Sequence, residues 1–133
     1  MSAPQPASAA PSPHEKLRQR IERRRARMAE YEAQMDDYDL PYYTLEHVEA
    51  ELLTERSALN SLLLALFDLG ADPAEAPAAA QLTRQLLEVE MDLLQNSINL
   101  SWPELGEAEE KALWKLGAEL RAKRATLLSK RTE

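Results

Sequence analysis

Apolar residues recur along the first forty positions at the spacing of an amphipathic helix. They alternate in steps of four and three, which places them on one face of a helix with 3.6 residues per turn. The stripe consists of Leu17, Ile21, Met28, Tyr31, Met35 and Tyr38, with Arg24 as its one charged member. The pattern predicts a helix that buries this face against a neighbour.

A second stripe with the same alternation lies between residues 45 and 69. It consists of Leu45, Val48, Leu52, Leu59, Leu62, Leu66 and Leu69, with Glu55 as its one charged member. If the two helices fold back on each other about the intervening "DLPYY" turn, Arg24 faces the second helix one turn from Glu55. The two charged members of the stripes are therefore predicted to pair.

Helix boundaries can be read from capping and breaking residues. The spacing of a capping box occurs at Ser12–Glu15, Asp72–Glu75 and Ser101–Glu104, and Thr44 supplies a cap without the full box. Pro41, Gly70 and Asn99 mark the ends. The predicted helices are 14–39, 45–69, 73–98 and 102–130, each about 37–44 Å long at 1.5 Å per residue. Matched lengths and short connections predict an all-α fold, an antiparallel up-down-up-down four-helix bundle.

The chain has 133 residues, a length that suits one domain with its own core. Residues 1–13 hold four prolines and no charge, so we expect a disordered N-terminal tail before a single helical domain at 14–133. The absence of cysteine excludes disulfides and thiolate metal sites, which is typical of a cytoplasmic protein. No apolar run is long enough to predict a membrane span.

Charge is segregated along the chain, whose formal net charge is -7. Residues 1–27 hold seven basic and two acidic groups, residues 28–110 hold two and nineteen, and residues 111–133 hold seven and two. The basic run "EKLRQRIERRRARM" is thus followed by a strongly acidic middle. It must be matched by an acidic helix of the same chain, by a protein partner or by a nucleic acid.

Pairing within the chain accounts for Arg24 and Arg27 but leaves most of the basic run unmatched. Arg18, Arg20, Arg23 and Arg25 are therefore predicted to bind an acidic protein surface. The alternative is contact with phosphates of a nucleic acid. It is disfavoured because no aromatic residue lies among these arginines and the acidic middle would repel a polyanion.

All four tyrosines lie within thirteen residues around the first predicted turn. Tyr31 and Tyr38 belong to the apolar stripe. Tyr42 and Tyr43 lie in the turn beside the carboxylates of Asp36, Asp37 and Asp39. This composition suits a surface that binds a basic or proline-containing peptide, since tyrosine offers rigid contact area with a polar tip. The alternative is that Tyr43 only packs near Val48 at the helix start.

The helices predicted at 45–69 and 73–98 are apolar around much of their circumference. Such helices are central in a bundle or contribute to an interface, so burial within the monomer competes with a homodimer or a groove for a partner helix. Asn96 lies on the apolar stripe of the third helix, where a polar residue often fixes register. A further possibility is that residues 1–39 form an independent coiled coil.

The sequence offers little for catalysis. His14 and His47 are not preceded by glutamate at the Glu-x-x-His spacing of a diiron bundle, and the aspartates lack a glycine-containing calcium loop. We therefore expect no catalytic, cofactor-binding or metal-binding residues. The sequence predicts a non-enzymatic interaction module, such as an adaptor, assembly factor or chaperone-like subunit. The alternative is a nucleic-acid-associated protein.

Overall fold

A computed structural model describes residues 10–37 and 39–131, with only the backbone of Tyr42 and Tyr43. It contains α1 (Pro13–Met35), α2 (Tyr42–Asp68), α3 (Pro77–Leu100) and α4 (Glu107–Lys130), and no strand among the described residues. The predicted all-helical class with four helices is confirmed. Most of the predicted disordered tail, residues 1–9, lies outside the described residues, as does Tyr38.

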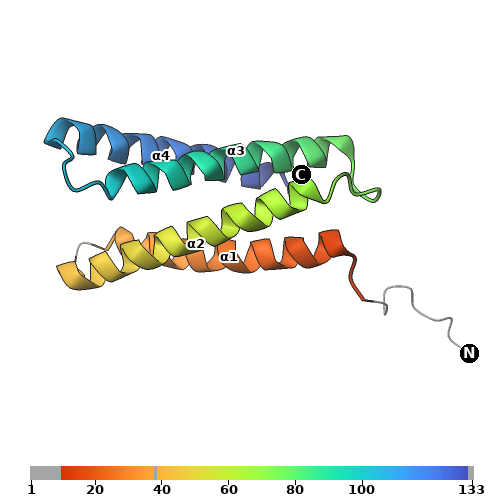
Figure 1. Ribbon diagram of the computed structural model, residues 1–133, viewed down its shortest axis with the longest axis horizontal. Helices are drawn as coiled ribbons and strands as arrows, with labels where there is room; N and C mark the ends of the chain where they lie inside the picture. The colour runs from red at the N-terminus through yellow and green to blue at the C-terminus, as the bar shows by residue number, and fades with distance from the viewer. Residues whose placement is uncertain (1–9, 38, 132–133) are drawn as a thin grey trace, which may run out of the picture.

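Figure 1 shows the four helices lying along the long axis of the molecule, with α1 and α2 below and α3 and α4 above. Each helix packs against the next one in the chain, α1 on α2, α2 on α3 and α3 on α4. The helix α2 inclines towards α3 at its C-terminal end and diverges from it at its N-terminal end. The molecule is therefore two helical hairpins that converge at one end and splay at the other.

The helix ends show which sequence signals act as caps. Ser12 Oγ accepts a hydrogen bond from the amide of Glu15 at 3.1 Å, so the first predicted cap is confirmed. Gly70 follows α2 with a φ of 90°, the left-handed conformation predicted for it. By contrast, α1 ends at Met35 rather than at residue 39, and α2 begins at Tyr42 with Pro41 as its N-cap rather than at a Thr44 cap.

The two other predicted caps were wrong. A helix beginning at residue 73 would place Pro77 in its interior, where proline removes a hydrogen bond and clashes with the preceding turn. Instead α3 begins at Pro77, a position at which proline is tolerated, and Asp72 accepts from the amide of Ala74 in the connecting loop. Likewise α4 begins at Glu107 after Gly106, which places three glutamates in its first turn, where the helix dipole favours them.

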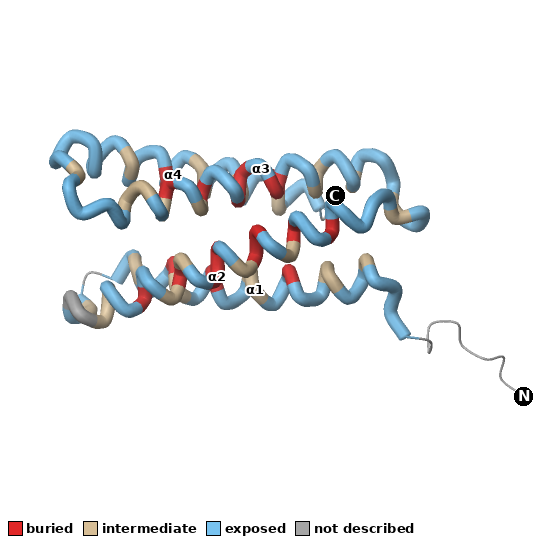
Figure 2. Tube along the Cα trace, in the orientation of Figure 1, coloured by how far each residue is buried: buried red, intermediate tan, exposed pale blue. Residues whose placement is uncertain are grey.

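The hydrophobic core is divided between the hairpins. The first cluster joins α1 to α2 and includes only Leu87 from the second hairpin; its buried members are Ile21, Met28, Leu52, Leu59, Leu63, Leu66 and Leu87. The second cluster joins α3 to α4 and consists of Leu86, Val89, Leu93 and Leu127. Buried positions, red in Figure 2, occur along all four helices. Each hairpin thus carries an apolar core of its own.

Polar contacts fix the register within each hairpin. In the first hairpin Arg24 Nη1 lies 2.9 Å from Glu55 Oε2, which confirms the pairing predicted from the two stripes, and Arg27 lies 3.7 Å from the same carboxylate. In the second, the buried Asn96 donates from Nδ2 to the carbonyl of Leu113 at 3.0 Å. The helices approach closely there, since a Cβ on Gly117 would lie 2.9 Å from Asn96 Oδ1.

Replacement of Leu59 tests the core of the first hairpin. This side chain is 0% exposed, so Leu59→Ala is expected to lower the free energy of unfolding by about 2–5 kcal/mol, through lost burial and the cavity left behind. Leu64→Ala on the same helix is the control, because Leu64 is 42% exposed. Urea denaturation measures both variants; equal losses would contradict the assigned core.

Candidate functional site

A network of five charged side chains lies between the two hairpins and includes residues from all four helices. Glu90 on α3 accepts from Arg25 on α1 at 2.8 Å and lies 3.4 Å from Arg124 on α4. Arg124 also donates to both carboxylate oxygens of Glu32 on α1, at 2.6 and 2.9 Å. Arg56 on α2 donates to Glu32 at 3.1 Å. We call these five residues the ionic network.

The ionic network is buried. The side chain of Glu90 is 1% exposed and that of Arg25 is 9% exposed. Burial lowers the pKa of Arg25 and of Arg56, an effect that the carboxylates of Glu90 and Glu32 oppose. A buried charge is tolerated only when it is paired and hydrogen-bonded, so each arginine here depends on a carboxylate contributed by another helix.

The charges and hydrogen bonds of the ionic network do not fully compensate one another. It contains three arginines and two glutamates. Three buried nitrogen atoms, Nε of Arg25 and Nε and Nη1 of Arg56, have no hydrogen-bond partner among the described residues. Apolar residues of the same volume often stabilise such a position more than ions do. We therefore expect the ionic network to contribute more to the geometry of the contact between the hairpins than to its stability.

Sequence reasoning missed most of this network. It identified the charged members of the apolar stripes, Arg24 and Glu55, but these pair within one hairpin. Glu90 carried a signal, because it lies four residues after Leu86 and three before Leu93, at the spacing of the apolar stripe. Its partners Arg25 and Arg124 belong to helices that are distant in sequence, so the pairing required the packed arrangement.

The structure separates the four arginines predicted to bind a partner. Arg25 is buried against Glu90, and Arg18 pairs with Asp72 and, at 3.4 Å, with Glu75 in the loop before α3. Arg20 and Arg23 are exposed and form no ion pair with any residue that the structure describes. Two of the four are thus used within the chain and two point to solvent.

A groove lies on one side of the ionic network, between α1, α3 and the end of α4. Its floor is apolar and includes Ile21, Leu63, Leu66, Leu82 and Leu86, and its volume is about 680 Å³. Its charged lining consists of Arg18, Arg25, Lys130 and Arg131 against Glu22 and Glu75. We call it the basic groove.

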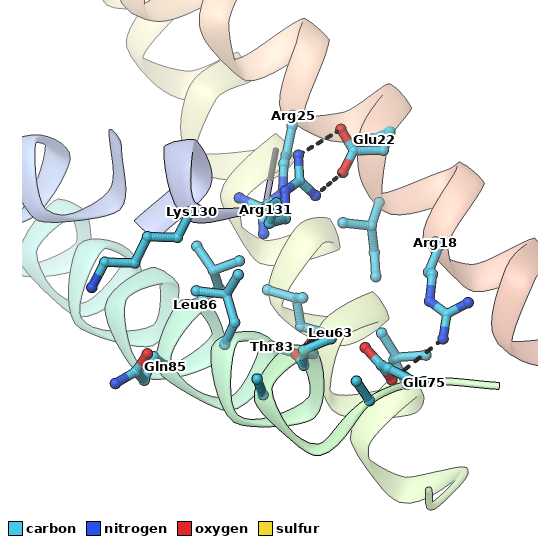
Figure 3. Close-up of a pocket in the computed structure, with 16 residues that line it drawn as sticks. Arg18, Glu22, Arg25, Leu63, Glu75, Thr83, Gln85, Leu86, Lys130 and Arg131 are labelled. Atoms are coloured by element: carbon cyan, nitrogen blue, oxygen red, sulfur yellow. Dashed lines mark hydrogen bonds and ion pairs between the residues drawn. The ribbon is translucent and has the colours of Figure 1, made fainter. Parts of the chain in front are cut away.

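Figure 3 shows how the charges of the basic groove are arranged. Arg131 pairs with Glu22 and Arg18 reaches Glu75, whereas the side chain of Lys130 extends away from them. Hydrogen bonding to Arg131 lowers the pKa of Glu22. Lys130 forms no ion pair within the described part of the chain, so the groove keeps an uncompensated cation at its edge.

A second groove lies on the other side of the ionic network, where the hairpins splay. Its volume is about 860 Å³, and its walls include Met35, Leu45, Leu53, Leu93, Leu100 and Trp114. Its charged lining is the reverse of the first: Glu32, Asp36, Glu46 and Glu49 against Arg56 and Arg121. We call it the acidic groove.

The predicted site at the first turn lies beside the acidic groove. Asp36 lines the groove and is 3.9 Å from Arg121, while Asp37 accepts from the amide of Asp39 within the turn at 3.0 Å. Tyr42 and Tyr43 begin α2, but their side chains lie outside the described residues. The role predicted for these two tyrosines stays a prediction.

Comparison with known proteins gives no relative: no protein-family model, curated protein or solved structure matches this chain. Among the described residues, no group of three or more His, Asp or Glu side chains is placed to hold a metal ion. None of the described helices is both long and apolar enough to cross a membrane. The ionic network and the two grooves are therefore the features that bear on function.

The ionic network is tested by Glu90→Gln, which removes the charge that Arg25 and Arg124 share. We expect the free energy of unfolding to fall by about 3–5 kcal/mol, because two buried guanidinium groups lose compensation. Glu88→Gln, an exposed neighbour on α3, should cost less than about 1 kcal/mol. Denaturant titration measures both, and a loss no larger than that of the control would contradict the network.

The acidic groove predicts a dependence on pH. Loss of hydration at the groove wall, followed by the charges of Glu46 and Glu110, raises the pKa of Glu49 above its ordinary value. Its ionised form therefore destabilises the fold above that raised pKa, and the penalty is absent below the ordinary glutamate value of about 4.3.

Glu49→Gln should accordingly raise the free energy of unfolding at pH 7 by less than about 1 kcal/mol, with no gain at pH 3. Thermal melts at the two pH values measure the difference, with Glu30→Gln as the exposed control. A gain of equal size at both pH values would show that the charge of Glu49 is not its cause.

Proposed function

We propose that this chain is a non-enzymatic protein-interaction module, an up-down-up-down bundle that binds an acidic amphipathic helix in the basic groove. It would act as an adaptor, assembly factor or chaperone-like subunit of a larger cytoplasmic complex. The observation that carries the proposal is the combination of an apolar floor and a mainly cationic lining in one groove. Amphipathic helices bind grooves of this kind through apolar residues at helical spacing.

The floor supplies the affinity in this proposal. Leucines from α2 and α3 line it beside the small side chains of Ala76, Ala78 and Ala79, which leave room for a partner's side chains. Burial of apolar area contributes roughly 25 cal/mol per Å² removed from water, before the cost of association. A partner helix with leucines along one face would pack on the exposed Ala76 and Ala78 and the half-buried Leu82, because the other leucines of the floor are already buried in the core.

The cationic lining supplies the selectivity. Lys130 has no carboxylate partner among the described residues, and Arg131 shares an exposed pair with Glu22, which is worth little in water. Both can turn to a carboxylate of a bound helix at small cost. Charges at the edge of an interface act mainly on the association rate and on the choice of partner.

The alternative function, contact with nucleic acid, is supported by the outer face of α1. Lys16, Arg20, Arg23 and Arg27 are exposed and follow one another at helical spacing, so they form a cationic stripe outside the basic groove. Arg27 lies near Glu55, and the chain as a whole is acidic. We rank this function second for that reason.

Binding of designed peptides tests the proposal. The probe is a fluorescent capped peptide of about 14 residues with leucines at helical spacing and glutamates beside them. Lys130→Glu with Arg131→Glu should weaken its binding by at least about tenfold, measured by fluorescence anisotropy. A peptide with lysines in place of the glutamates should not compete for the groove.

The matched control is Arg20→Glu with Arg23→Glu, which changes the net charge equally but lies on the outer face. We expect it to weaken the peptide by less than about threefold. If it weakens the peptide as much as the groove variant does, the proposed groove is wrong. If a labelled duplex binds instead, with an affinity that falls steeply with salt and is lost in the control, the nucleic-acid function gains the support.

A further inference from the structure

The acidic groove shares no lining residue with the basic groove and lies on the opposite side of the ionic network. The acidic groove is therefore independent of the function proposed for the basic groove. Its walls come from all four helices, and they leave the groove apolar inside with carboxylates at its edge.

The dimensions of the acidic groove suit a helical segment. Along α2 its lining extends from Leu45 to Arg56, a length of about 16 Å, or three helical turns. The small side chain of Ala50, which is exposed on α2, leaves room in the groove. The space of about 860 Å³ exceeds what one bulky side chain fills.

The carboxylates of this groove differ in how they are used. Glu32 is held by Arg56 and Arg124, and Asp36 is near Arg121. Glu46 and Glu49 are exposed, lie at helical spacing and form no ion pair with any described residue. Two unneutralised carboxylates at the edge of an apolar groove favour a cationic ligand.

The indole of Trp114 forms part of the wall of the acidic groove. It is 47% exposed, which is high for a large aromatic side chain on a helix that packs against α3. An exposed aromatic beside leucines offers contact area and a face for a cation. Together with the carboxylates, it defines the chemistry of the occupant.

We propose that the acidic groove is a second docking site, and that it binds a basic amphipathic helix of a protein partner. The apolar face of that helix packs on Leu53, Leu100 and Trp114, and its lysines or arginines pair with Glu46 and Glu49. The module then carries two grooves of opposite charge selectivity, separated by the ionic network, and can hold two different segments at once.

The experiment uses the full chain with Trp102→Phe. The protein has two tryptophans, and Trp102 does not line the groove, so Trp114 becomes the sole indole reporter. The probe is a capped peptide of about three helical turns with leucines at helical spacing and flanking lysines. We expect a blue shift of Trp114 emission that saturates with peptide, and no such shift with the same peptide carrying glutamates.

Two charge-matched variants localise the binding. Glu46→Gln with Glu49→Gln should weaken the lysine peptide by at least about tenfold, a loss of about 1.4 kcal/mol. Glu30→Gln with Glu88→Gln removes two exposed carboxylates outside the groove and should change affinity by less than about threefold. Circular dichroism checks that all variants remain helical.

Several outcomes would overturn the inference. Equal loss in both variants would show attraction to the net negative charge alone. Equal shifts with both peptides would show an apolar site without charge selectivity. An unchanged Trp114 emission would place binding elsewhere. If Trp114 is already shielded and becomes exposed on dilution as a dimer dissociates, the occupant is a second copy of this chain rather than a basic partner helix.

Discussion

The ionic network between the hairpins is the constraint on which the rest of the structure depends. The hairpins meet where α2 packs on α3, with Leu87 buried in the first cluster and Asn60 donating to the carbonyl of Glu90. We infer that the five residues of the ionic network, which join all four helices, fix the relative position of the hairpins beyond this contact. Charged groups at this depth need partners in a fixed geometry. We therefore expect the network, together with the packing of α2 on α3, to set the angle and the separation at which the two hairpins meet.

The grooves follow from that arrangement. Long arginine side chains reach between helices whose backbones do not pack closely, and α1 and α4 are such a pair. A groove is left on each side of the network, and each groove has apolar residues inside and excess charge at its edge. The segregated charges of the sequence thus appear in three dimensions as two grooves of opposite charge. A module that binds two segments would use both.

Much of the fold could be predicted from periodicity and caps, because both are local. The stripes predicted the pairing of Arg24 with Glu55, and Ser12 and Gly70 acted as predicted. The starts of α3 and α4 were missed because Asp72 and Ser101 have capping-box spacing, yet Pro77 and Gly106 move the helix starts past them. The ionic network was harder to predict from the sequence. Arg25 and Arg20 look alike in the sequence, and only packing against α3 makes one a buried ion and leaves the other in solvent.

Distances between the hairpins test this account most directly. The chain has no cysteine, so spin labels can be placed at Ala29 and Ala122, which are exposed on α1 and α4, and at Ala29 and Ser57 within the first hairpin. Pulsed electron–electron double resonance should show one narrow distance distribution for each pair of labels in the native protein. In Glu90→Gln the account predicts that the distance between hairpins broadens while the distance within the hairpin is kept. Both distances unchanged, or both broadened together, would contradict an ionic network that positions two separately packed hairpins.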